Sequence, residues 1–171
     1  MKVRPILNLL GIGLVYFSFF QLLPIAISLI YEENNFTDYS GAFFITLITG
    51  IAFWVATYKE KQDTIRIKEG FILTVAFWVL FTVFASLPFL LSSTHDFSIV
   101  DAYFETTSAL TTTGSTVLVG LESYSKSLLF YRALLQWLGG MGIIVLAVAI
   151  FPLLGVGGMQ LYKNEGSGVM G

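Results

Sequence analysis

The chain has 171 residues, of which 56% are hydrophobic and 12% are charged, and its mean hydropathy is +0.80. A soluble domain of this length cannot bury so much apolar surface, so the composition predicts an integral membrane protein. The chain has no cysteine, which excludes disulfide and thiolate chemistry, and its single histidine, His95, excludes a histidine-based metal cluster.

The first uncharged run extends from residue 5 to residue 31. Lys2 and Arg4 resemble the charged start of a signal peptide, but the hydrophobic region of such a peptide normally ends after about 7 to 15 residues. Polar residues beginning at Glu32 follow directly, without a small-residue cleavage site. The sequence therefore predicts a retained transmembrane helix.

Two further spans are predicted from hydropathy and flanking residues. The run 39–58 is long enough to cross a bilayer and ends with Trp54 and Tyr58, aromatic residues that favour the headgroup level. Segment 59–69 is the most highly charged in the chain and predicts a short connecting loop. A third span then covers residues 70–91. Inside the second span, Gly50 is interpreted as a small residue at a helix contact.

A half-length helix is predicted after the third span. Ser98 and Asp101 have the spacing of a capping box, which opens a helix. Residues 101–110 would rise about 15 Å, about half of the hydrocarbon core, so this segment must re-enter the membrane and turn back. The last span runs from about residue 128 to Pro152, which we expect to end the helix.

The turn between these segments, residues 110–116, reads Leu-Thr-Thr-Thr-Gly-Ser-Thr and predicts an ion filter. Irregular backbone at membrane depth is tolerated only where it lines a pore or is covered by protein. Gly114 reaches positive φ at little steric cost, and the β-branched threonines favour extended backbone. An ordinary polar turn is the alternative, and the half-length helix argues against it. The predicted potassium ligands are Thr111, Thr112, Thr113, Gly114 and Ser115.

The distribution of basic residues predicts the orientation of the spans. One side of the membrane carries only Lys126. The other, which is therefore cytoplasmic together with the N-terminus, carries Lys2, Arg4, Lys59, Lys61, Arg66, Lys68 and Lys163. The carboxylates that fall outside would concentrate cations at the pore mouth. They are Glu32, Glu33, Asp38, Asp96, Asp101 and Glu122.

Two charged residues near the filter have alternative interpretations. Arg132 either extends to the outer interface or pairs with a buried carboxylate, for which Glu105 is the nearest candidate by topology. Glu105 either braces the pore helix or contacts the ion. Gly139, Gly140 and Gly142 indicate either close helix packing or flexibility of the last span.

Three segments resemble a known family: the filter region 109–117, the Leu-Gln-Trp-Leu-Gly-Gly-Met-Gly-Ile-Ile-Val-Leu run at 135–146, and residues 155–162. Together with segment 4–31 they resemble the N-terminal part of the membrane subunit of Trk/Ktr-type potassium uptake systems, closest to the TrkH branch. The resemblance implies four span-pore-span repeats around one permeation path. It also implies a homodimer of full-length subunits, a cytosolic nucleotide-binding regulatory subunit and a prokaryotic cytoplasmic (inner) membrane.

The chain departs from this family pattern because it contains one pore loop and ends at Gly171. A fragment, a split gene product and a self-assembling half-size subunit are all compatible with that ending. The expected division is a two-helix membrane region at 1–69, a span-pore-span repeat at 70–162 and a short cytoplasmic tail at 163–171.

The sequence thus predicts an all-α integral membrane protein that conducts potassium as part of a Trk-type pore. Two alternatives stay open: a less selective monovalent cation pore, and a non-conducting membrane subunit that assembles or anchors a partner. The residues form no catalytic constellation, so an enzyme is not expected. The expected partners are the potassium ion, the lipid bilayer and further pore repeats, with no covalent cofactor and no nucleic acid.

Overall fold

The computed structural model describes residues 3–59 and 65–167, with side chains up to residue 148. Every regular element in this part of the chain is a helix and none is a strand, which confirms the all-α prediction. The elements in chain order are α1 (Val3–Phe20), α2 (Leu23–Ile30), α3 (Phe36–Thr57), α4 (Ile67–Ala85), α5 (Leu87–Leu90), α6 (Ile99–Leu110), the 3-10 turn η1 (Leu121–Ser123) and α7 (Lys126–Ser167).

Four of the described segments are long and apolar enough to cross a membrane. They are Val3–Ile30, Phe36–Thr57, Ile67–Leu90 and Lys126–Val148. The predicted spans are confirmed to within a few residues, and α6 lies between the third and the fourth as a 12-residue helix. Such a helix rises about 18 Å, too short to cross the hydrocarbon core.

The first and third spans are each broken in the third that lies farthest from the N-terminal end of the bundle, which the sequence interpretation did not predict. A proline follows each break. Pro88 has no N–H for the carbonyl of Phe84, and the side-chain amide of Gln21 donates to that oxygen instead (3.0 Å). The Tyr131 hydroxyl donates to the neighbouring Ala85 carbonyl (2.7 Å). Side chains from α7 and the first span therefore satisfy backbone groups that the break releases.

Helices α1 and α3 pack with their backbones in contact at Gly11 and Gly50. A Cβ on Gly11 would lie 2.8 Å from the Gly50 carbonyl oxygen and 2.7 Å from the Trp54 nitrogen. A Cβ on Gly50 would in turn lie 2.9 Å from the Gly11 carbonyl oxygen. The interpretation of Gly50 as a packing residue is confirmed.

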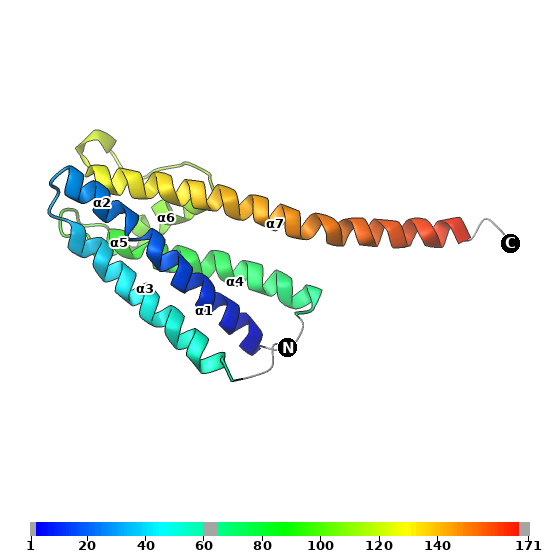
Figure 1. Ribbon diagram of the computed structural model, residues 1–171. Helices are drawn as coiled ribbons and strands as arrows, with labels where there is room; N and C mark the ends of the chain where they lie inside the picture. Colours follow the sequence, from blue (N-terminus) through cyan, green and yellow to red (C-terminus); the bar gives the residue numbers. More distant parts are fainter. Residues whose placement is uncertain (1–2, 60–64, 168–171) are drawn as a thin grey trace.

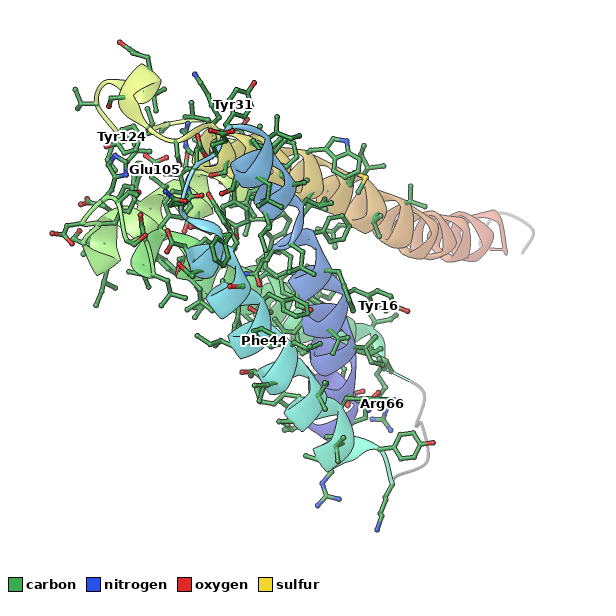
Figure 2. All side chains as sticks on the ribbon, turned by 60° about the vertical axis from the view of Figure 1, so that its left-hand side comes forward. Tyr16, Tyr31, Phe44, Arg66, Glu105 and Tyr124 are labelled. Atoms are coloured by element: carbon green, nitrogen blue, oxygen red, sulfur yellow. The ribbon has the colours of Figure 1, made fainter. Side chains whose placement is uncertain are left out.

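The two ends of the bundle differ in the charged residues of their segments. The start of α1, the end of α3 and the start of α4 lie at one end (Figure 1). Figure 2 shows Arg66 at this end and Tyr31 and Tyr124 at the other. The loops at 31–35, 91–98 and 118–125 belong to that second end. Acidic residues of these loops therefore lie far from the basic end, as the sequence predicts; Lys2 and Lys61 lie outside the described residues.

Helix α7 does not end at Pro152, so that expectation is wrong. It continues to Ser167 and extends beyond the other helices in Figure 1. An interior proline removes one backbone hydrogen bond, and the ladder on both sides of it can carry a long membrane helix onward. Residues 163–167 of the expected tail therefore belong to α7, and 168–171 lie outside the described residues.

Candidate ion-filter segment

The pore helix α6 is held at its start by a side-chain cap. The Ser98 hydroxyl accepts a hydrogen bond from the Asp101 N–H (3.0 Å), as the capping spacing predicts. One face of the helix is buried against α4, α5 and α7. The helix ends at Leu110, directly before the threonine run, so α6 determines where the candidate filter begins.

The threonine run starts with a C-terminal helix cap of the Schellman type. The Thr113 N–H donates to the Ser108 carbonyl (2.9 Å) and the Thr112 N–H to the Ala109 carbonyl (3.0 Å). Thr112 has a φ of +58°, where a β-branched residue is rare and costs about 1–3 kcal/mol. The predicted extended backbone at Thr111 and Thr112 is therefore wrong, because both residues complete the helix end.

Gly114 has a φ of +79°, the conformation that its sequence context predicts. A Cβ at this position would meet nothing within 4 Å in the chain. The glycine is thus required here for its backbone angle, and steric blocking inside the single chain plays no part.

Backbone oxygens of the turn remain available for a ligand. The carbonyls of residues 111–114 accept no hydrogen bond from the described part of the chain, and these residues are exposed. The hydroxyls are used locally: that of Thr111 donates to the Thr107 carbonyl (2.7 Å) and lies 2.9 Å from that of Thr113. The turn therefore offers carbonyl oxygens, the ligands that replace water around a permeating alkali cation.

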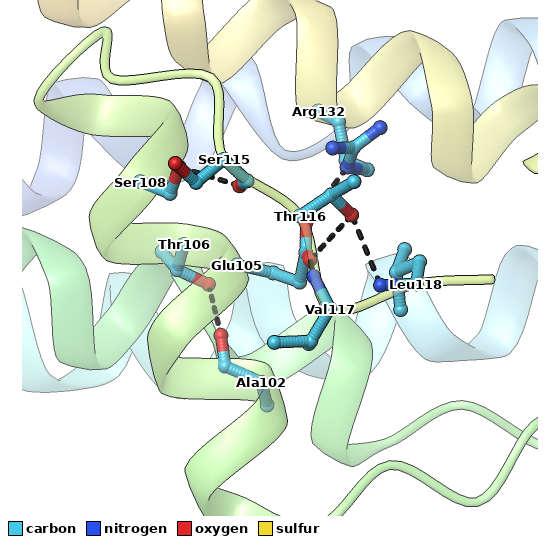
Figure 3. Close-up of polar contacts among 9 residues, drawn as sticks. All are labelled: Ala102, Glu105, Thr106, Ser108, Ser115, Thr116, Val117, Leu118 and Arg132. Carbon is cyan, nitrogen blue, oxygen red and sulfur yellow. Dashed lines mark hydrogen bonds and ion pairs between the residues drawn. The ribbon is translucent and has the colours of Figure 1, made fainter.

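Ser115 differs from the four residues before it. Its carbonyl accepts a hydrogen bond from the Ser108 hydroxyl (2.6 Å), which ties the chain back to α6 (Figure 3). The segment after the turn is thus fixed to the helix that precedes it.

Glu105 is the main brace of the filter segment. Its side chain is buried, and one oxygen accepts hydrogen bonds from the Thr116 hydroxyl (2.6 Å) and the Val117 N–H (2.5 Å) (Figure 3). The other oxygen pairs with Nε of Arg132 on α7 at 3.0 Å. Within the chain, the bracing role suggested for Glu105 is the one observed, and Arg132 pairs with it instead of extending to the interface.

These contacts connect three elements around one buried carboxylate. Glu105 comes from α6, Thr116 and Val117 from the segment that follows the turn, and Arg132 from α7. A buried charge is tolerated when it is paired and its remaining oxygens are hydrogen-bonded. The contacts of Glu105 therefore fix the position of the segment next to the exposed carbonyls.

A second carboxylate, Glu33, caps the start of α7. It accepts hydrogen bonds from the backbone N–H groups of Lys126 and Ser127. Burial raises the pKa of the Glu33 carboxyl, but hydrogen bonds from Ser127 and Lys126 outweigh this and hold that pKa below its ordinary value. The Asn35 amide and the Tyr39 hydroxyl also bond to the Ser127 hydroxyl (2.9 and 3.0 Å). From the sequence, Glu33 is expected only among the carboxylates at the pore mouth.

A half-length helix, a turn with free carbonyls and flanking apolar spans define a multi-pass membrane protein with a re-entrant pore loop. Residues 35–169 match the family described as "TrkH: Cation transport protein". The chain therefore belongs to the TrkH family, which consists of transporters and not enzymes, and the resemblance seen in the sequence is confirmed.

Relatives cover almost the whole chain. It is 45% identical over 165 residues to the Trk system potassium uptake protein TrkH of Vibrio parahaemolyticus and 46% identical to that of Escherichia coli (strain K12). Each match covers 96% of this chain and 34% of the relative, so the chain spans about a third of their length. TrkG of E. coli is 37% identical over 163 residues, covering 95% of this chain and 33% of TrkG.

The fold matches a solved structure. The crystal structure of the potassium transporter TrkH from V. parahaemolyticus has a TM-score of 0.86 and 43% identity, covering 92% of this chain and 34% of that one. Together with the four apolar spans, these relatives identify a multi-pass bacterial membrane protein.

Proposed function

We propose that the chain forms part of a potassium-selective pore, with Thr111, Thr112, Thr113, Gly114 and Ser115 in its filter. The observation that carries the proposal is the row of exposed carbonyls at residues 111–114, which accept no hydrogen bond within the described residues. Glu105 braces the segment that follows them. The relatives named as potassium uptake proteins support potassium as the ion.

One copy of the chain cannot complete such a filter. A dehydrating potassium ion needs oxygens on all sides, and this turn supplies them on one side only. The exposed polar backbone of residues 111–117 also needs protein or pore water to cover it at membrane depth. Further pore repeats must therefore surround the same axis. The length of the relatives supports repeats within one longer polypeptide.

The remaining expectations form part of the same proposal. The basic end of the bundle faces the cytoplasm of a prokaryotic cell, across the inner membrane, and the acidic end faces outward. Residues 1–69 form a two-helix membrane region, 70–162 the span-pore-span repeat and 163–171 a short cytoplasmic tail. Full-length subunits form a homodimer that binds a cytosolic nucleotide-binding regulatory subunit.

Topology is tested by single-cysteine labelling, because the chain has no native cysteine. Asn34→Cys should react with a membrane-impermeant thiol reagent added outside intact cells, and Tyr58→Cys should react only after the membrane is opened. The reverse pattern would contradict the orientation of the bundle and the placement of the carboxylates at an external pore mouth.

Conduction is tested with a chimera in which this chain replaces the matching N-terminal third of E. coli TrkH. The chimera should restore rubidium uptake to cells that lack their own potassium uptake systems.

In this chimera, Gly114→Asp should reduce rubidium uptake or the preference for rubidium over sodium, and Thr116→Ser should have a milder effect. Unchanged uptake and sodium competition in the Gly114→Asp variant would contradict the filter assignment. Equal uptake of sodium and rubidium by the unmodified chimera would instead identify a less selective pore.

A further inference from the structure

Helix α7 crosses the end of the pore helix at Gly139. A Cβ on Gly139 would overlap the carbonyl oxygen of Leu110 and would lie 2.7 Å from its carbonyl carbon and 3.0 Å from its Cα. The obstructing atoms all belong to the backbone, which cannot rotate away as a flexible side chain can. At this point the backbones of α6 and α7 are in contact, and there is no room for a side chain on Gly139.

The neighbouring glycines are not under the same constraint. A Cβ on Gly140 would have its nearest neighbour at 3.9 Å, the Cγ2 atom of Thr112, and one on Gly142 would lie 3.8 Å from the Trp78 ring. Both distances are ordinary van der Waals contacts. Of the three glycines in this run, Gly139 is the one whose missing side chain the structure requires.

The contact is made at the residue that precedes the filter. Leu110 is the last residue of α6, and Thr111 begins the turn whose carbonyls are free. Arg132 lies seven residues before Gly139, two turns away on the same face of α7, and pairs with Glu105. Helix α7 thus contacts the pore segment at two points: Arg132 pairs with Glu105, which bonds to Thr116 and Val117, and Gly139 meets the end of α6.

We propose that Gly139 is a positioning residue for the filter. By allowing α7 to touch the Leu110 carbonyl, it sets the depth of the α6 end and the direction in which carbonyls 111–114 point. This inference rests on the proposed function of that segment. A methyl group on Gly139 must separate α6 from α7 and move the ligand oxygens. In enzyme active sites, which also depend on exact orientation, a misplacement of about 1 Å can lower the reaction rate about 100-fold.

The first test is rubidium uptake by the chimera carrying Gly139→Ala, with Gly140→Ala as the matched control. We expect Gly139→Ala to raise the half-saturating rubidium concentration at least about tenfold or to weaken discrimination against sodium by a similar factor. Gly140→Ala should leave both values near those of the unmodified chimera. A purely structural defect would lower the amount of transporter and its maximal rate while leaving half-saturation and ion preference unchanged, and that result would overturn the proposal.

The second test measures the contact itself and does not depend on conduction. The pair Thr112→Cys and Gly140→Cys would place two thiols in neighbouring positions, close enough for a disulfide or a short thiol crosslinker. Oxidation of the full chain in membranes should give an intramolecular crosslink, detected by intact mass and peptide mapping. Gly139→Ala should lower its yield several-fold, and Gly142→Ala should not.

The two tests separate the two claims. If the unmodified chimera fails to transport while the crosslink responds to Gly139→Ala, the proposed function is contradicted and the positioning contact is supported. If the chimera transports and Gly139→Ala changes neither its ion preference nor the crosslink, the role of Gly139 is overturned and the proposed function stands.

Discussion

The α1–α3 pair depends on glycine for close packing, whereas the α6–filter–α7 region depends on it both for packing, at Gly139, and for a backbone angle, at Gly114. At Gly11 and Gly50 the missing side chain lets two helices touch. The Asn8 side-chain amide of α1 donates to the Thr57 hydroxyl of α3 (2.9 Å), and the Thr46 hydroxyl donates to the Ala42 carbonyl of its own helix (2.8 Å). Tyr16 and Phe44 project outward from the bundle (Figure 2). At Gly114 there is open space, and the backbone angle is what requires glycine.

The filter region also carries features that cost stability, which the helix pair lacks. A buried ion pair joins Glu105 to Arg132, Thr112 has positive φ, and backbone carbonyls are left without donors from the described chain. Such departures from local preference persist only where surrounding contacts enforce them, and they gather at functional sites. Under the proposed function, the comparison separates a helix pair that serves packing from a filter region that presents oxygens.

The largest effect is expected from Glu105→Ala. The substitution leaves Arg132 without its partner and removes the acceptor for Thr116 and Val117. Breaking a buried pair in this way costs about 3–5 kcal/mol. Thermal unfolding of the purified protein should show a large loss of stability. Glu105→Gln combined with Arg132→Gln should recover part of it, and no recovery would contradict a pairwise interaction.

A smaller loss is expected from Gly50→Ala. The added methyl would lie 2.9 Å from backbone atoms of α1, and overpacking of this kind costs about 1–3 kcal/mol. Gly70→Ala in α4, where nothing lies within 4 Å, is the matched control and should be neutral or slightly stabilising. Gly50→Ala should lower the unfolding temperature without changing ion preference. A change of selectivity without loss of stability would break the distinction between the two regions.

Gly114→Ala and Thr112→Gly should act in opposite directions on stability. Alanine at position 114 must adopt positive φ, at a cost of about 1–2 kcal/mol, whereas glycine at position 112 releases a similar strain. Urea or thermal unfolding of the two variants measures the difference. Destabilisation by Thr112→Gly equal to that by Gly114→Ala would show that the strain assigned to Thr112 is absent.

The smallest effect is a pH dependence from Glu33. Its pKa in the folded protein is below its ordinary value of 4.5, so the cap on α7 stabilises the fold above that value and is lost as pH falls through the folded pKa. Unfolding temperatures measured between pH 7 and pH 3 should fall less steeply in Glu33→Gln than in the unmodified chain. Identical slopes would contradict the capping role.

The features that could be predicted from the sequence are those that depend on residues close together in the chain. Hydropathy locates the four spans, and the Ser98 cap together with segment length predicts α6 as a half-length helix. The Glu105–Arg132 pair was one of two alternatives, because a charge in an apolar span must either reach water or find a partner.

Other features depend on contacts between residues far apart in the chain. Nothing near Glu33 in sequence shows that α7 begins beside it, 93 residues later. The Schellman cap was missed because its left-handed position holds threonine where glycine is usual. Pro152 reads as a helix end, yet α7 continues through it. In each case tertiary contacts or the continuing helix overrule the local preference.

Rubidium anomalous diffraction from crystals of an assembled transporter containing this chain would test the filter assignment most directly. The account predicts an anomalous peak on the pore axis in contact with carbonyl oxygens of residues 111–114, with Glu105 behind them and away from the ion. Rubidium bound elsewhere on the axis, or directly to the Glu105 carboxylate while those carbonyls stay unoccupied, would contradict it.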